Sequence, residues 1–282
     1  MNFITMGVVM RRFGLLKVLA VLVLALAGSN AGAQQGKVEV LWLGHAAFRI
    51  ATPGGKVIVI DPALSVMPAT PPQYKKPEAL GKVDLLLVTH GHWDHITDAP
   101  AIAKLNNIPM FAPGDLNMAL TTLGVLPPAQ LPRSNKSGRL TPVPGIKVTL
   151  THAEHSSVYV WRNPATGKEE THPGGEPVGY IIELENGFKI WHMGDTGIFG
   201  DMKWIAEYYK PDLVMIPVGG QFGMDGADAA WALRELIKPK YAIPMHYRVV
   251  PGAKTPPQQM VEALGPTPIK VLLMKPGEKA EF

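Results

Sequence analysis

Residues 89–95 concentrate side chains that bind metal ions. The sequence Thr-His-Gly-His-Trp-Asp-His places three histidines and one aspartate close together: His90, His92, Asp94 and His95. Neutral imidazole nitrogens and a carboxylate are ligands that Zn²⁺ and similar divalent cations prefer. The chain has no cysteine, so it can offer no thiolate ligand. A lone histidine in a loop usually binds nothing, but four ligand-type side chains at this spacing predict a metal site.

The elements around this segment position its side chains. The apolar run 83–88, broken only by Asp84, predicts a buried parallel strand that ends just before the histidines. In an extended segment or a tight turn, His90 and His92 project to the same side, so both can reach one ion. Asp94 and His95 lie just beyond, where the chain turns into a helix predicted near 98–106, and can face a second ion.

Other candidate ligands follow other predicted strands. In layered α/β folds the strand ends form one rim, where side chains distant in sequence converge. We expect His155 to complete the set begun by His90 and His92. Asp195, in a Gly-Asp-Thr-Gly turn, is expected to bridge two ions, although capping is the ordinary role of an aspartate there. His246 is expected to be the last ligand of the second ion, with a core position as the alternative.

The remaining polar candidates have less definite roles. Asp61 and His45 either orient metal-bound imidazoles through hydrogen bonds or cap turns, and both alternatives stay open. His192 is a candidate acid or oxyanion donor. Asp94 or Asp195 is expected to take up a proton during catalysis.

The rest of the pattern predicts one α/β domain over residues 34–282. Alternating runs at 37–43, 47–52 and 57–60 predict antiparallel strands joined by hairpins, and Asn186-Gly187 marks another hairpin. We expect polar or glycine-rich loops at 65–82 and 162–177.

Between and after these loops, alternation of strands and helices is expected. A strand is predicted near Gly124-Val125, and helices are predicted at 202–209 and 227–237. Asp225 is the expected N-cap of the second of these helices.

The first 33 residues resemble a secretory signal peptide. Arg11 and Arg12 precede an apolar run at 18–27, and Ala31-Gly32-Ala33 resembles a cleavage site. The apolar run is short for a membrane span, and a buried helix is the alternative. We therefore expect cleavage near Ala33 and a periplasmic or secreted protein.

The charge of the chain argues against a nucleic-acid partner. The net charge of +4 falls to +1 if Arg11, Arg12 and Lys17 leave with the signal peptide. The sequence also has no basic run with interleaved aromatic residues. We expect a small-molecule substrate, no nucleic acid, and no membrane contact beyond export; the sequence does not indicate an oligomeric state.

Taken together, these strings resemble the metallo-β-lactamase superfamily. Within it, the chain is similar to metal-dependent hydrolases such as ascorbate-phosphate lactonases and, more distantly, N-acylphosphatidylethanolamine phospholipase D. The strings that carry the resemblance span about 37–275 and are 89–95, 153–157, 192–197, 219–224 with 228–230, and 244–247. The resemblance implies a four-layer αββα sandwich, with two mixed β-sheets, outer helices and metals at one edge.

By position, the resemblance also implies a ligand set. The first ion would be held by His90, His92 and His155, the second by Asp94, His95 and His246, and Asp195 would bridge them. The expected cofactors are two divalent ions, with Zn favoured and Mn, Fe or Ni as alternatives.

Two such ions lower the pKa of a shared water from ~15.7 toward ~7, and the resulting hydroxide could cleave an ester, lactone, amide or phosphodiester. An exported metal-binding protein without hydrolytic activity is one alternative. A β-lactamase is another, although it is not expected to carry the strings at 219–220 and 244–247.

Overall fold

The computed structural model describes residues 36–248 and 255–282. The predicted signal peptide at 1–33 lies outside these ranges, so it stays a prediction. Within the same ranges, no helix combines the length and the apolar character needed to cross a bilayer.

Seven strands form the first mixed sheet, in the order β16-β1-β2-β3-β4-β5-β6. The strands are β1 (Glu39–Gly44), β2 (Ala47–Ala51), β3 (Val57–Ile60), β4 (Leu85–Leu87), β5 (Met110–Pro113), β6 (Arg133–Ser134) and β16 (Lys279–Glu281). The antiparallel pairing of β1 with β2 and of β2 with β3 confirms the predicted hairpins. The predicted strand before the metal-binding motif is also confirmed, because β4 is buried and pairs in parallel with β3 and β5.

A second seven-stranded sheet has the order β15-β14-β13-β12-β11-β8-β7. Its strands are β7 (Arg139–Val143), β8 (Ile146–His152), β11 (Val178–Glu183), β12 (Lys189–His192), β13 (Leu213–Pro217), β14 (Tyr241–Met245) and β15 (Lys270–Val271). The hairpin β11–β12 turns at Asn186-Gly187 as predicted, and Gly187 has a φ of 83°. Strands β12 to β15 run parallel.

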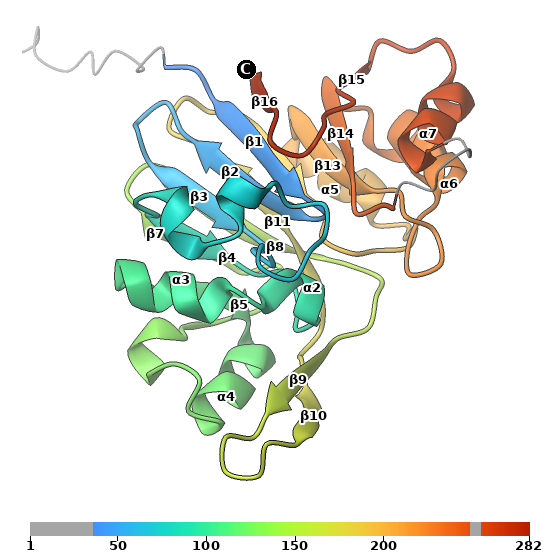
Figure 1. The fold of residues 1–282 in the computed structure, drawn as a ribbon. Helices are drawn as coiled ribbons and strands as arrows, with labels where there is room; N and C mark the ends of the chain where they lie inside the picture. The colour runs from blue at the N-terminus through green and yellow to red at the C-terminus, as the bar shows by residue number, and fades with distance from the viewer. Residues whose placement is uncertain (1–35, 249–254) are drawn as a thin grey trace, which may run out of the picture. The chain divides into compact units, whose positions relative to one another are not determined.

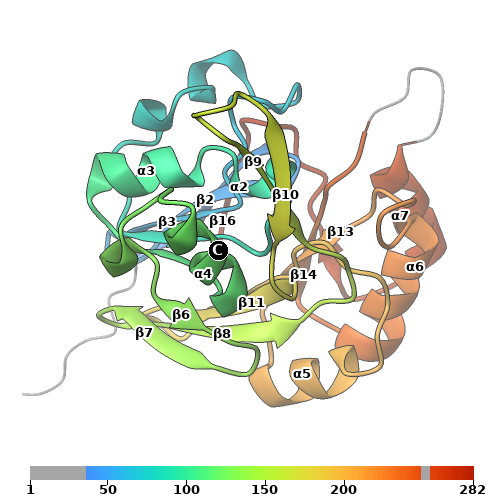
Figure 2. The ribbon, with the colours of Figure 1, turned by 90° about the horizontal axis from the view of Figure 1, so that it is seen from below.

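Helices cover the outer faces of both sheets. The helices are α2 (Trp93–Ile96), α3 (Ala99–Asn106), α4 (Gly114–Thr122), α5 (Met202–Tyr209), α6 (Gly226–Trp231) with the π-helical turn η4 (Ala232–Ile237), and α7 (Pro256–Leu264). Figures 1 and 2 show α3 and α4 beside the first sheet and α5, α6 and α7 beside the second. The predicted αββα layering is thus confirmed.

Apolar residues on both faces of each strand explain the layers. In β1, Val40 and Trp42 belong to the cluster between the two sheets, whereas Leu41 and Leu43 belong to the cluster under α3 and α4. A third cluster lies between the second sheet and its helices. Sheets covered on both sides bury both faces, and this requires apolar side chains at consecutive positions.

Tyr180 links the two sheets near the metal-binding motif. Its ring is fully buried in the cluster between the sheets, and it comes from β11. The hydroxyl donates to the carbonyl of Val88 at 2.8 Å and to that of Phe111 at 3.2 Å, both on the first sheet. The end of β4 is therefore held against β11 by a directional contact as well as by apolar packing.

Two expectations about the secondary structure differ from the fold. The strand predicted near Gly124-Val125 is wrong: α4 ends there, Gly124 turns with a φ of 67°, and Val125 N donates back to Leu120 O at 3.0 Å. The loop predicted at 162–177 contains part of a separate hairpin, β9 (Val158–Arg162) with β10 (Glu169–Pro173). The expected loop at 65–82 holds two 3₁₀ turns, η1 (Pro72–Tyr74) and η2 (Pro77–Leu80).

Candidate metal centre

All seven predicted metal ligands meet at one edge of the two sheets. They follow four strands: His90, His92, Asp94 and His95 come after β4, His155 after β8, Asp195 after β12 and His246 after β14. His45 and Asp61, which follow β1 and β3, reach the same place. Ligand-type side chains distant in sequence therefore converge as the sequence predicted, although proximity alone does not assign a role to each of them.

His90, His92 and His155 form the first group. One ring nitrogen of each lies within 4.8 Å of the corresponding atoms of the other two. Nε2 of His90 is 2.8 Å from Nδ1 of His92. Burial lowers the pKa of all three imidazoles, and it does so most for the fully buried His90. They are consequently neutral at pH 7, which is the form that binds a metal ion.

His45, Asp94, His95 and His246 form the second group, again with ligand atoms within 4.8 Å of one another. Oδ2 of Asp94 lies 2.9 Å from Nε2 of His45 and 3.5 Å from Nε2 of His246. The rings of His45 and His246 are only 3.8 Å apart between centroids. His45 is thus a fourth member of a set for which three ligands were predicted.

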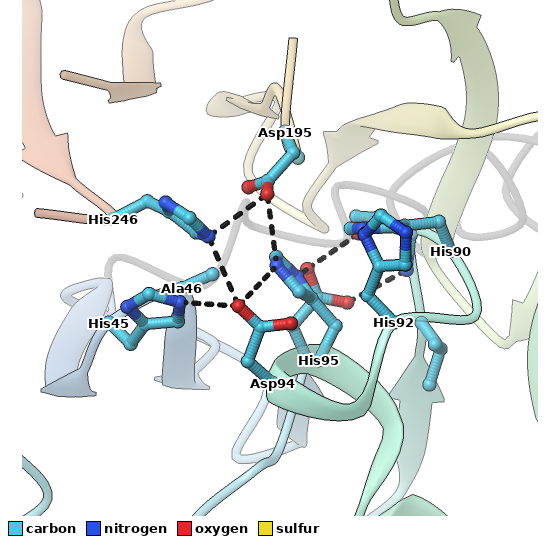
Figure 3. A network of polar contacts seen from close by, with 12 residues as sticks. His45, Ala46, His90, His92, Asp94, His95, Asp195 and His246 are labelled. Carbon is cyan, nitrogen blue, oxygen red and sulfur yellow. Dashed lines mark hydrogen bonds and ion pairs between the residues drawn. The ribbon is translucent and has the colours of Figure 1, made fainter. Parts of the chain in front are cut away.

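Asp195 lies between the two groups. Its Oδ2 is 2.9 Å from Nε2 of His246, 3.3 Å from Nε2 of His95 and 3.6 Å from Nε2 of His155. Figure 3 shows Asp195 and Asp94 pointing toward each other, with His95 and His246 between them. One carboxylate oxygen therefore reaches nitrogens of both groups, which is the position a bridging ligand requires.

Three buried atoms at this place are left without a hydrogen bond. They are Nε2 of His95, Nε2 of His246 and Oδ1 of Asp195; the two nitrogens are close to carboxylate oxygens but lack the angles of a hydrogen bond. Buried polar atoms without partners are costly and uncommon. Imidazole nitrogens and carboxylate oxygens are also the donors that divalent transition-metal ions take. The residues therefore fit such ions.

Asp61 orients two of the histidines. It is fully buried and accepts hydrogen bonds from Thr89 N at 2.7 Å, Thr89 Oγ1 at 2.7 Å and His95 Nδ1 at 2.8 Å. Since Thr89 gives its only hydroxyl proton to Asp61, its oxygen accepts from Nδ1 of His90, 3.0 Å away. Both histidines therefore donate from Nδ1, and once a metal ion displaces the second proton of His95, both direct the lone pair of Nε2 into the site.

The pKa values follow from the charges packed together here. Burial lowers the pKa of His246, but the carboxylates of Asp195 and Asp94 together outweigh it and raise that pKa to about 9. For His95, burial is likewise outweighed, by Asp195 and Asp61, and the pKa lies well above its usual range. Burial raises the pKa of Asp195, yet His95 and His246 hold it well below its ordinary value. In the absence of a metal ion, the protonated imidazoles of His95 and His246 thus balance the charge of Asp195, as a bound cation could.

Three residues of the site adopt left-handed backbone conformations. The φ angles are 54° at His45, 48° at Asp61 and 55° at His246. Such angles are uncommon outside glycine and cost roughly 1–3 kcal/mol each, so the surroundings must enforce them. At His45 the carbonyl is held by His246 N at 3.1 Å and by Nε1 of Trp42 at 3.0 Å.

His192 is placed differently from the other candidates. Its ring is fully buried, Nε2 lies 3.0 Å from the carbonyl of Ala46, and Nδ1 accepts from Gly194 N at 3.2 Å. A neutral ring with its proton on Nε2 satisfies both contacts, and burial lowers its pKa. The role predicted for His192 as an acid or oxyanion donor has no support in this geometry, because both nitrogens are engaged with backbone.

Sequence reasoning missed Thr89. Its hydroxyl connects Asp61 to His90, although it was considered only as part of the motif. The available signal was its position: a hydroxyl residue directly after a buried strand and directly before the first histidine. His152 and His172 lie outside the groups, paired with Glu154 at 3.3 Å and with Glu170 at 3.5 Å.

Comparisons with known proteins identify the family. The model of the β-lactamase superfamily domain matches residues 56–247. A UPF0173 metal-dependent hydrolase of Polaromonas sp. is 65% identical over 247 residues, covering 88% of this chain and 90% of its own length. One of Polynucleobacter asymbioticus is 56% identical over 273 residues, covering 94% of this chain and 95% of its own length.

Solved structures agree with this assignment. Igni18, a metallo hydrolase from Ignicoccus hospitalis, superimposes with a TM-score of 0.70 at 30% identity, covering 87% of this chain and 98% of that one. YhfI from Bacillus subtilis, a metallo-β-lactamase fold protein, gives 0.62 at 13% identity over 88% of this chain and all of its own length, which shows the shared fold. The chain therefore belongs to the metallo-β-lactamase superfamily, as a member of the UPF0173 family of metal-dependent hydrolases.

Proposed function

We propose that this chain hydrolyses an ester, lactone, amide or phosphodiester bond with the help of two divalent ions. The observation that carries the proposal is the position of Asp195, whose Oδ2 lies within 3.6 Å of nitrogens from both groups. His90, His92 and His155 would hold one ion; Asp94, His95 and His246 would hold the other, and Asp195 would bridge them. Zn is the preferred metal, because imidazole nitrogens and carboxylate oxygens are among its usual ligands; Mn, Fe and Ni accept the same donors and stay alternatives.

Different residues of the chain would orient the metal ligands and take up the proton. When bound, two such ions supply a water that ionises near neutral pH and polarise the oxygen of the scissile group. Asp61 and Thr89 keep the histidine lone pairs directed into the site. Of the two carboxylates, Asp94 reaches solvent with 19% of its side chain exposed, whereas Asp195 has 4%. We therefore assign proton uptake from the substrate side to Asp94.

Two finer expectations belong to the same proposal. The names of these relatives specify no substrate, so the similarity to ascorbate-phosphate lactonases stays an expectation and the substrate stays open. We also propose export to the periplasm or beyond, with cleavage near Ala33. Sequencing the N-terminus of protein purified from its native cells tests this: an intact Met1 or Met10 would contradict it.

The metal content of the purified protein tests the proposal first. We expect about two ions per chain in the wild type and fewer in Asp195→Ala and His246→Ala. His152→Ala is the matched control, because His152 lies outside both groups and should leave the content unchanged. No bound metal under metal-replete conditions would refute the proposed mechanism.

Turnover is the second test. Hydrolysis of a panel of esters, lactones, amides and phosphodiesters should be abolished by a chelator and restored by added Zn²⁺. Two bound ions without chelator-sensitive turnover on any substrate would instead indicate a metal-binding protein without hydrolytic activity.

A further inference from the structure

Four exposed apolar side chains lie on the segments that carry the candidate metal ligands or on the neighbouring loop 219–225. Their exposed fractions are 54% for Trp93, 39% for Val158, 37% for Ile198 and 65% for Phe222. Single exposed apolar residues are ordinary, but a group of them around a functional site marks a surface that binds something apolar. The position of each one relative to the ligands decides whether they form such a group.

Trp93 and Val158 are attached to the metal-binding motif. Trp93 lies between His92 and Asp94 in the chain. Val158 begins β9, and its carbonyl packs so closely on Gly91 that a Cβ atom there would lie 3.0 Å from that oxygen. Ser157, one residue earlier, accepts a hydrogen bond from Gly91 N at 3.1 Å. Figure 2 also shows β9 beside α2.

Ile198 and Phe222 are attached to the other side of the site. Ile198 follows Asp195 by three residues, and Gly197 N donates to Glu154 O at 2.9 Å, next to His155. The loop that carries Phe222 packs against the same turn, because Met224 N donates to Thr196 O at 3.1 Å.

The other end of that loop meets the second group. Gly219 lies so close to His246 that a Cβ atom there would be 2.2 Å from the His246 carbonyl. The four segments therefore contact one another or the ligands directly.

These segments adjoin the side of the site that faces solvent. His90, His95 and Asp195 are buried, whereas His92, Asp94, His155 and His246 are partly exposed. Trp93 is the chain neighbour of two of the partly exposed ligands, and the loop of Phe222 packs on a third, His246. The four exposed apolar residues therefore lie on segments that border the partly exposed ligands.

The same segments carry no fixed positive charge. Residues 90–98, 153–158, 195–200 and 219–225 contain no lysine or arginine. Sites that recognise phosphate or carboxylate groups usually supply arginine or lysine side chains for them. Arg248, two residues after His246 and exposed, is the cation nearest in sequence to a ligand of the second group. The entrance as a whole thus suits an uncharged group better than an anionic one.

We propose that the substrate is a neutral carboxylic ester whose acyl group is apolar and packs against Trp93, Val158, Ile198 and Phe222. This inference rests on the proposed hydrolytic function and names its substrate class. In the reaction, the oxygen of water bonds to the acyl carbon, the bond from that carbon to the alcohol oxygen breaks, and the alcohol leaves with a proton. Each methylene of the acyl chain that the four side chains bury should raise kcat/KM, by up to about fourfold when burial is complete.

A chain-length series tests the proposal with the Zn²⁺-loaded, full-length protein. We would measure kcat/KM for p-nitrophenyl acetate, butyrate and octanoate, and for the anionic bis(p-nitrophenyl) phosphate, with and without chelator. The expected octanoate-to-acetate ratio is at least about tenfold, and Phe222→Ser and Ile198→Ser should each lower that ratio at least threefold. Leu105→Ser is the matched control, since Leu105 lies on α3, away from the site, with an exposed fraction of 52%, between those of Ile198 and Phe222, and the ratio should not change.

The outcomes separate this proposal from the proposed function. Chelator-sensitive hydrolysis with a ratio of one or less would overturn the proposed apolar acyl site and leave the hydrolase intact. A preference for the phosphodiester that Arg248→Ala abolishes would overturn the neutral ester as substrate and also leave the hydrolase intact.

If no substrate is hydrolysed, binding of 2-decanone, an uncharged analogue with no leaving group, tests whether the apolar site exists. Saturable quenching of tryptophan fluorescence that disappears in Trp93→Phe would support the apolar site, and its absence would overturn it.

Discussion

Replacing Asp61 by asparagine should weaken metal binding although Asp61 is not itself a predicted ligand. Asp61 accepts three hydrogen bonds, two on Oδ2 from Thr89 Oγ1 and His95 Nδ1, and one on Oδ1 from Thr89 N. Asparagine has the same shape, but an NH₂ group, which donates hydrogen bonds, replaces one of the two oxygens. This NH₂ group then faces another donor, either the backbone N–H of Thr89 or the ring N–H of His95.

The cheaper adjustment moves the proton of His95 from Nδ1 to Nε2. That proton would point into the site and remove one lone pair from the second ion. Loss of partners that orient metal ligands typically costs 10–100-fold in affinity, or about 1.4–2.8 kcal/mol. If the chain keeps the original tautomer instead, an unsatisfied buried donor lowers the free energy of unfolding by about 1–3 kcal/mol.

Competition with a chromophoric Zn²⁺ chelator measures the affinity, and urea unfolding of the metal-free protein measures the stability. Asp98→Asn is a matched control, because Asp98 is also buried and accepts from Ser65 N and Ser65 Oγ, but contacts none of the ligands. It should lose stability and keep its affinity. An Asp61→Asn protein that binds two ions as tightly as the wild type, with unchanged stability, would refute the reasoning.

Three further predictions follow from the same geometry. Asp195 and Asp94 together outweigh the effect of burial and raise the pKa of His246 from the ordinary 6.5 to about 9. The protonated form therefore stabilises the metal-free fold below about pH 6.5, and this contribution is lost as the pH rises through 9. Metal affinity should instead rise toward pH 9, because the ion must displace that proton. Thermal unfolding in the presence of chelator measures the stability, and calorimetric titration with Zn²⁺ measures the affinity. Stability and affinity that change in the same direction between pH 6.5 and 9 would contradict the prediction. Tyr180→Phe removes the hydroxyl that the carbonyls of Val88 and Phe111 share as a donor. The free energy of unfolding, measured by urea titration, should fall by about 1–3 kcal/mol. An unchanged urea midpoint of unfolding would show that water replaces the hydroxyl. His155→Ala should lower the metal content by about one ion per chain, since His155 is the only member of the first group that comes from the second sheet; elemental analysis showing two ions would argue against its role as a ligand.

Local sequence patterns were sufficient where a signal lies within a few residues. The alternation in β1, the Asn-Gly turn before β12 and the cap of α6 by Asp225, which accepts from Ala227 N and Asp228 N, were all predicted correctly. The clustering of ligands followed from a simple rule, because each candidate directly or closely follows a strand, and those strands end at one edge.

Contacts between distant segments could not be predicted in this way. β9 begins with Val158-Tyr159-Val160-Trp161, a run of strand-forming residues, but the glycine, proline and charged residues that follow it favoured a loop, and the hairpin was missed. The short β16 pairs with β1 across almost the whole chain, and its own sequence carries no strand signal. The difference between His192 and His246, both at strand ends, depends on what each ring meets: a backbone carbonyl for His192 and two carboxylates for His246.

The left-handed conformations of His45, Asp61 and His246 would mislead a laboratory evolution experiment that selects for stability alone. At each of these positions glycine would adopt the observed φ without steric cost, so relief of the strain offsets part of what the lost side chain contributed. A library selected for heat resistance alone would be expected to enrich glycine at position 45, where the side chain makes the fewest bonds to the surrounding fold. Such variants would be more stable but would lack the contact of His45 Nε2 with Asp94 Oδ2 at 2.9 Å, so directed evolution on this scaffold needs a functional screen at every round.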